Sequence, residues 1–299
     1  MVYNRTDSGG RPTTLPGTKQ IAAPVSIRLD SHPSLCQAQE KAMATLRFYA
    51  ELNDYLSPKL RRQDIGTHLA EPCPVRHLIE THGVPHTEVE VILINGVSVD
   101  LEAPVHGGDL VSVYPMFEAL DVSPLLRLRP EPLREPRFFA DAQLGRLARY
   151  LRLLGFDTRY ENSVDDAELV RLAGAERRII LSRDRALLMR RDVTHGCHIR
   201  QDDPMEQITH VIRRCDLSRA CHPFTRCVEC NGRLEAVSKE EVADRLEPET
   251  AACFDEFWRC EGCSRVYWKG SHYERLQRLV TAMLDDAQQN AQDSGLGRR

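Results

Sequence analysis

The middle of the chain alternates short apolar runs with segments in which apolar and polar residues recur at helical spacing. The apolar run Phe138–Ala140 is typical of a buried strand. After it, apolar residues recur at three- and four-residue steps: Leu144, Leu147, Ala148, Leu151 and Leu154. This spacing predicts a helix with one buried face, which Gly155 ends.

The same alternation continues to about residue 218. Further short apolar strands are expected at 156–160, 178–181 and 197–200, and helices at 165–173, 185–191 and 205–214. Strands that alternate with helices at this spacing indicate an α/β domain with a parallel sheet and helices on both faces. We place this domain at 137–218.

A smaller unit precedes it. A strand is expected at 44–50, a helix at 74–83, a hairpin at 88–101 around Asn95-Gly96, and a strand at 110–115. This order resembles the ubiquitin-like β-grasp fold of small sulfur-carrier proteins, and we place that α+β domain at 43–120. The carriers react through a free Gly-Gly end, whereas Gly107-Gly108 here is internal. A binding module of unknown partner is therefore expected.

Composition indicates where the connecting segments lie and in which compartment the protein is expected. Gly and Pro mark 1–42 as a flexible extension, and Pro and Arg mark 121–136 as a stiff basic linker. No apolar run is long enough to span a bilayer, and no signal pattern is present, so a soluble, cytoplasmic protein is expected. The net charge is −4, yet Arg outnumbers the acids in 123–160 and 176–201. Arg suits bidentate contact with phosphate.

Four acids recur where an expected strand gives way to a helix: Asp141, Asp166, Asp184 and Asp203. In a parallel sheet these junctions share one edge, so the carboxylates are expected to converge there. Clustered carboxylates repel one another unless a cation neutralises them, and their hard oxygen atoms suit Mg²⁺ or Mn²⁺. A divalent ion bound in this way can catalyse phosphodiester hydrolysis. The alternative is that each acid is only a helix N-cap, or that Asp184 pairs with a neighbouring Arg.

Four sequence blocks resemble, in order, the PIN-like ribonuclease family named after the C-terminal domain of the nematode protein Mut-seven. They are FFADAQLGRLARYLRLLGFDT, DDAELVRLA, RIILSRDRALL and DDPMEQI. The resemblance implies RNA as substrate and Mg²⁺ or Mn²⁺ held by acids at the sheet edge. Asp141 and Asp184 match the family's strand-end acids. Asp166 matches the family's next acid better than Asp165 does, and Asp203 matches the last acid better than Asp202 does. Both assignments stay open.

We therefore expect a three-layer α/β/α ribonuclease domain with a carboxylate metal site. Four Arg beside the acids are candidates for binding RNA phosphates: Arg146, Arg149, Arg183 and Arg185. The alternative function is a non-catalytic RNA-binding or adaptor protein that keeps the PIN-like core.

Two Cys-x₂-Cys pairs give the most specific signal in the chain: Cys227, Cys230, Cys260 and Cys263. Their spacing is typical of a structural zinc ribbon, which we place at 219–275. Cys221, His222 and Cys253 are rival ligands. Aromatic and cationic residues around the second pair can form the ribbon's small core or contact nucleic acid. A closing helix at 273–287 and a loose tail complete the last segment, 276–299.

Overall fold

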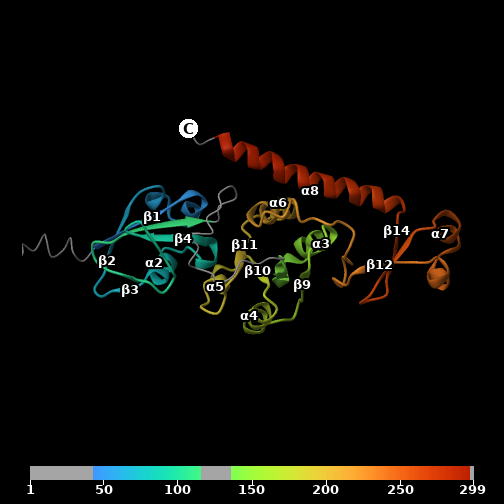
Figure 1. Cartoon of the computed structure of the whole chain (residues 1–299), viewed down its shortest axis with the longest axis horizontal. Coiled ribbons are helices and arrows are strands. Elements are labelled where there is room, and N and C mark those ends of the chain that lie inside the picture. Colours follow the sequence, from blue (N-terminus) through green and yellow to red (C-terminus); the bar gives the residue numbers. More distant parts are fainter. Residues whose placement is uncertain (1–42, 116–135, 297–299) are drawn as a thin grey trace, which may run out of the picture.

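The computed structural model describes residues 43–115 and 136–296, with side chains described as far as Ala287. Figure 1 shows three units along the longest axis: the N-terminal domain, a central α/β unit and a small C-terminal unit. One long helix, α8 (Ser271–Leu296), runs back from the C-terminal unit over the central one.

The N-terminal domain has the expected β-grasp architecture. Its sheet has the order β2-β1-β7-β4-β5, with β1 and β7 parallel and the other neighbours antiparallel. The strands are β1 (Met43–Phe48), β2 (Ile65–His68), β4 (Val89–Ile94), β5 (Val97–Val99) and β7 (Leu110–Pro115). Helix α2 (Val75–Thr81) buries Val75, Leu78 and Ile79 in the domain's core.

The turn of the expected hairpin is present in this domain. Asn95 and Gly96 have φ values of 52° and 82°, the left-handed conformation that a tight two-residue hairpin requires. Strand β2 was not expected, because the 3-10 helices η1 (Ala50–Tyr55) and η2 (Pro58–Leu60) separate it from β1 without a hairpin signal. A short pair, β3 (Cys73–Pro74) and β6 (Pro104–Val105), lies apart from the main sheet.

The central unit contains the expected parallel sheet, with the order β11-β10-β8-β9. Its strands are β8 (Phe138–Ala140), β9 (Thr158–Tyr160), β10 (Ile179–Ser182) and β11 (Gly196–His198). The first strand in sequence therefore lies inside the sheet. The chain moves from β8 outward to β9, then crosses back over β8 to β10 and β11.

Helices cover both faces of this sheet. On one face lie α3 (Gly145–Leu153), α6 (Pro204–Arg214) and α8, and on the other α4 (Asp166–Ala175) and α5 (Arg185–Leu188). Phe138 belongs to the first core and Phe139 to the second, because successive strand residues point to opposite faces. The three-layer α/β/α prediction is confirmed.

The C-terminal unit is a three-stranded antiparallel sheet of β12 (Leu234–Val237), β13 (Phe257–Cys260) and β14 (Val266–Trp268). Between β12 and β13 lie the 3-10 helix η6 (Glu240–Arg245) and α7 (Pro248–Cys253). Helix α8 begins earlier and ends later than the expected 273–287, and Val280, Met283 and Ala287 join the core of the central unit.

The β-grasp domain is docked on the outer edge of β11. Glu88, in the 3-10 helix η3 (His86–Glu88), accepts a hydrogen bond at 2.7 Å from the backbone N–H of His198. It also forms an ion pair with Arg214 at 3.3 Å, in which both side chains are buried. Edge strands present unpaired backbone groups, and here the neighbouring domain pairs one of them.

Candidate active site and metal centre

Strands β8 and β10 form the topological switch point of the parallel sheet. They are neighbours, yet the chain leaves β8 towards α3 on one face and leaves β10 towards α5 on the other. Open α/β sheets bind ligands in the crevice outside the carboxyl ends of such a strand pair. Asp141 follows β8 directly and Asp184 follows β10, so two of the expected acids lie at this crevice.

Ser182 connects these two acids. Its hydroxyl donates to Asp141 Oδ2 at 2.7 Å and accepts the backbone N–H of Asp184 at 2.9 Å. Ser182 is fully buried at the end of β10, and the register places Ala140 opposite Leu181, which sets Asp141 beside it. No role was expected for Ser182 from the sequence, because its partner Asp141 lies 41 residues away along the chain.

Both acids also cap the helical turns that follow them. Asp141 Oδ1 accepts the N–H of Ala142 at 2.6 Å, and Asp184 Oδ1 accepts the N–H of Ala186 at 2.7 Å. The capping alternative is thus present in the structure. It leaves room for a second role, because a carboxylate has about four lone-pair positions and each cap uses one.

The other two acids lie on the same edge of the sheet but apart from this pair. Asp165 caps α4 by accepting the N–H of Glu168 at 2.8 Å, whereas Asp166 is the first helical residue. Asp203 caps α6 through the N–H groups of Met205 and Glu206. Within the described residues, no three of the expected acids form a group that could hold a metal ion as the four Cys do. The expected convergence of four carboxylates is therefore not assembled in this structure.

The remaining donor set suits magnesium better than a crowded four-acid site would. Mg²⁺ keeps several waters and is held in proteins through one or two carboxylates. Asp141 and Asp184 supply two carboxylates at the ends of neighbouring strands, and the Ser182 hydroxyl bonds the carboxylate of Asp141 and the backbone N–H of Asp184. These residues fit a hard divalent cation.

The four expected phosphate-binding Arg residues divide into paired and unpaired groups. Arg149 bonds Glu229 at 2.8 Å, and Arg183 bonds Asp202 at 2.5 Å. Within the described residues, Arg146 and Arg185 have no ion pair or hydrogen bond. Only the unpaired Arg side chains offer their full donor set to an anion without first breaking a contact.

His198, at the end of β11, contacts both this site and the β-grasp domain. Its Nε2 lies 3.2 Å from the carbonyl oxygen of Arg183 and its Nδ1 lies 3.2 Å from the hydroxyl of Tyr55. A carbonyl only accepts, so Nε2 carries the proton and Nδ1 accepts from Tyr55. Burial lowers the pKa of His198, which favours this neutral form. No role was expected for His198 from the sequence.

The four cysteines of the Cys-x₂-Cys pairs converge as expected: the sulfur atoms of Cys227, Cys230, Cys260 and Cys263 lie within 4.8 Å of one another. Cys230 and Cys260 Sγ are 3.3 Å apart, and Cys227 and Cys263 Sγ are 3.7 Å apart. A tetrahedron with Zn–S bonds of about 2.3 Å has edges of about 3.8 Å. The cluster therefore fits zinc, and the rival ligands Cys221, His222 and Cys253 lie outside it.

The backbone is shaped to admit these sulfur atoms. A Cβ on Gly232 would lie 2.7 Å from Cys260 Sγ, closer than a Cβ atom tolerates. The Tyr267 hydroxyl lies 3.0 Å from Cys227 Sγ, as an outer contact to a thiolate ligand should.

The first Cys pair is joined to the parallel sheet. Arg152 donates to the carbonyls of Val228 and Glu229 at 3.1 and 2.8 Å and to that of Thr158 at 2.9 Å. Asn231 accepts the N–H of Thr158 and donates to Asp157, each within 2.9 Å. The ribbon is thus built onto the end of the α/β unit that carries β9.

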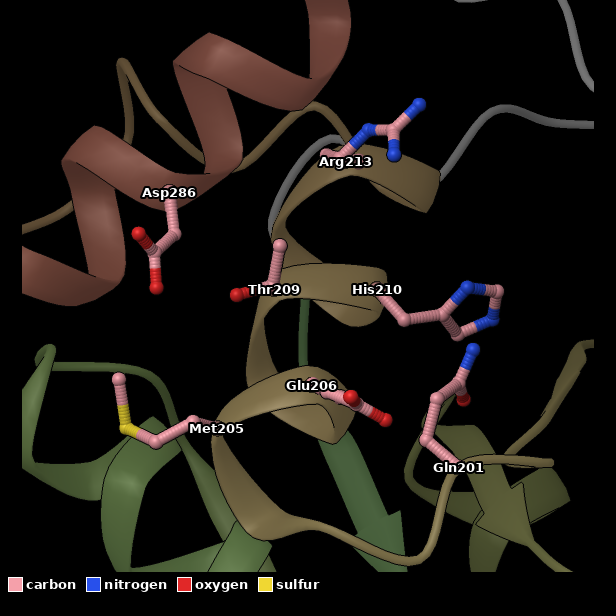
Figure 2. A pocket seen from close by; sticks show the side chains of 7 residues that line it. All are labelled: Gln201, Met205, Glu206, Thr209, His210, Arg213 and Asp286. Atoms are coloured by element: carbon pink, nitrogen blue, oxygen red, sulfur yellow. The ribbon is translucent and has the colours of Figure 1, made fainter.

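A cavity of about 370 Å³ lies on α6, away from the Asp141–Asp184 pair. Figure 2 shows its lining, with His210 and Gln201 pointing towards each other and Asp286 contributed by α8. Burial lowers the pKa of His210 to about 4, so this side chain is neutral near pH 7. Its lining includes neither Asp141 nor Asp184.

Comparison with known families agrees with this organisation. A family model described as the Mut7-C RNAse domain matches residues 136–280, and one described as Mut7-C ubiquitin matches residues 41–121. No curated protein and no solved structure matches the chain. The first match spans both the parallel sheet and the zinc ribbon, the two parts that Arg152 and Asn231 join. In the described parts of the chain, no helix has the length and apolar character needed to cross a membrane.

Proposed function

Because the chain belongs to the Mut7-C RNAse domain family and carries the Mut7-C ubiquitin domain ahead of it, we propose that it is a metal-dependent ribonuclease. The observation that carries this proposal is the pair Asp141 and Asp184, joined by Ser182 at the switch point of the sheet. Its substrate is RNA, and its chemistry is hydrolysis of a phosphodiester bond.

The acids and the serine have separate tasks. Asp141 and Asp184 bind Mg²⁺ or Mn²⁺ through the carboxylate oxygens that their helix caps leave available. When bound there, such an ion would lower the pKa of a water and offset the charge that develops on the phosphate. Ser182 bonds the carboxylate of Asp141 and the backbone N–H of Asp184, so it fixes the two strand ends relative to each other. Asp166 and Asp203 remain predicted further ligands from the same edge.

The cations and the ribbon complete the proposal. Arg146 and Arg185 bind RNA phosphates, since neither is committed to an acid within the described residues. Zn²⁺ held by the four Cys has no open position and is structural. Cys side chains that bind zinc rather than form disulfides fit a reducing compartment such as the cytoplasm.

The test is RNA cleavage by the full chain with Mn²⁺. Asp141→Asn and Asp184→Asn keep the shape of the caps but remove the charge that binds the ion. We expect each substitution to lower the rate of cleavage by about 100-fold or more. Each loss of about 1.4 kcal/mol of transition-state stabilisation lowers the rate tenfold. Asp192→Asn is the matched control, because Asp192 is an exposed acid paired with Arg190.

The second candidate function is a non-catalytic RNA-binding or adaptor protein. It is favoured by the observation that no three of the expected acids form a metal-binding group within the described residues. An adaptor would bind RNA but leave it intact in Mn²⁺, with wild type and Asp141→Asn behaving alike. That result would reject the ribonuclease proposal.

A further inference from the structure

A second cavity, of about 360 Å³, lies between α3 and the zinc ribbon. Its lining is polar and strongly cationic: Gly145, Arg146, Arg149, Arg152, Tyr160 and Glu229. Ligand pockets in proteins begin at about 300 Å³, so the cavity has room for part of a nucleotide.

The cavity lies on the same edge of the sheet as Asp141. Strand β9 ends at Tyr160, and the register places Tyr160 beside Ala140, the residue before Asp141. The Tyr160 hydroxyl donates to the carbonyl of Ala142 at 2.9 Å, and Asp141 caps the N–H of that same residue. If one phosphate of an RNA strand lies at Asp141, the neighbouring part of the strand can therefore enter this cavity.

A glycine makes the cavity possible. A Cβ on Gly145 would lie 2.6 Å from the Tyr160 hydroxyl oxygen and 2.8 Å from the ring carbon that bears it. Any side chain at this position would push the Tyr160 ring out of its place in the cavity wall.

The three Arg residues of the lining are not equivalent. Arg152 is buried and committed to three backbone carbonyls, so it positions the ribbon. Arg149 bonds Glu229, whose other oxygen lies 3.7 Å from Arg265. Arg146 is exposed and without an ion pair or hydrogen bond among the described residues. The cavity therefore holds one uncompensated guanidinium, which is free to form bidentate bonds with an anion.

We propose that this cavity is a phosphate subsite for the RNA strand next to the cleaved bond, with Arg146 as its phosphate-binding residue and the ribbon's Glu229 as a restraint on Arg149. The inference rests on the proposed ribonuclease function for its substrate. It gives the ribbon a part in binding RNA, because Glu229 lies between two zinc-ligand positions and forms one wall of the cavity.

The test measures binding of a fluorescent single-stranded RNA to the full chain by anisotropy, over a series of NaCl concentrations without added divalent metal. Arg146→Gln should weaken binding by about 10-fold and reduce the slope of log affinity against log salt by about 0.7, the value for one lost phosphate contact on a single strand. Arg171→Gln is the matched control, since Arg171 is exposed on the opposite face and paired with Glu168. Its effect should stay within about twofold.

A variant of opposite sign completes the test. Glu229→Gln removes the acid of the cavity and releases Arg149, so RNA binding should become tighter and its salt slope steeper. If Arg146→Gln matches the Arg171→Gln control, or Glu229→Gln weakens binding, the subsite is refuted even where wild type cleaves RNA. If the two variants shift binding in the expected directions but wild type never cleaves RNA, the subsite stands and the ribonuclease proposal fails.

Discussion

The ion pair between Glu88 and Arg214 should be the main electrostatic link between the β-grasp domain and the α/β unit. Its side chains are 5% and 7% exposed, so neither charge is solvated. Glu88 Oε2 lies 3.3 Å from Arg214, while Oε1 accepts the His198 N–H at 2.7 Å. Burial lowers the pKa of Arg214, but the attraction of Glu88 and of the smaller neighbouring acidic groups together outweighs burial, and the net pKa lies above its usual value.

Glu88→Gln changes one charge and almost no volume. The amide oxygen can still accept the His198 N–H, but Arg214 becomes an uncompensated buried charge, since its Nε and Nη1 have no partner within the described residues. Breaking a buried pair in this way costs about 3–5 kcal/mol. The exposed pair of Glu168 and Arg171 supplies the control, for which Glu168→Gln should cost about 0–1 kcal/mol.

Two measurements check this. Urea unfolding followed by circular dichroism should show the loss in Glu88→Gln, and the double variant Glu88→Gln/Arg214→Met should recover most of it, because no buried charge is left. Native-state hydrogen exchange should show faster exchange of the His198 amide in Glu88→Gln as the domain docking loosens. A Glu88→Gln protein no less stable than Glu168→Gln, with an unchanged His198 exchange rate, would refute the reasoning.

Two further predictions concern the zinc cluster and the buried histidine. Metal analysis should find about one zinc per chain. Cys260→Ser should lose the zinc and the stability of the ribbon, since structural zinc contributes about 10–16 kcal/mol in isolated fingers. Cys253→Ser, outside the cluster, should keep its zinc, and a wild-type protein without zinc would contradict the assignment. Because burial lowers the pKa of His210 to about 4 against an ordinary 6.5, the unfolded chain binds a proton in that window that the folded chain does not. Stability should therefore fall by up to about 3 kcal/mol as pH drops from 6.5 to 4, and His210→Gln should lose that part of the slope; equal slopes in urea titrations at several pH values would disprove it.

Local features of the fold were predictable because they depend on neighbours in sequence. The Asn95-Gly96 turn, the helix after Asp141 and the two Cys pairs follow from short-range rules, and the structure contains each of them. The misses have a common physical origin. Strand β2 pairs with β1 across two 3-10 helices, so no turn signal marks it, and the extent of α8 depends on packing against α6.

The candidate site was predictable in part for the same reason. A strand-end acid can be recognised from the apolar run before it, and Asp141 and Asp184 were found in this way. Ser182 could not be given a role, because its partner Asp141 is distant in sequence and becomes a neighbour only through strand pairing. From the sequence, Arg149 and Arg183 were candidates for binding phosphate, but tertiary contacts pair each of them with an acid.

The sequence by itself determined the two folded domains, the zinc ligand set and the acids that follow the strands, because periodicity, capping and Cys spacing act over a few residues. Only the tertiary structure decided which acids meet. Strand order places β8 beside β10 and sets β9 and β11 on the outside, so Asp141 and Asp184 share Ser182 while Asp166 and Asp203 remain apart. It also decided that Arg146 lines a cavity beside the ribbon with no acid partner among the described residues, and that Glu88 bonds the edge of β11. Strand order and domain docking are set by the packing of whole surfaces, for which no short segment carries a signal.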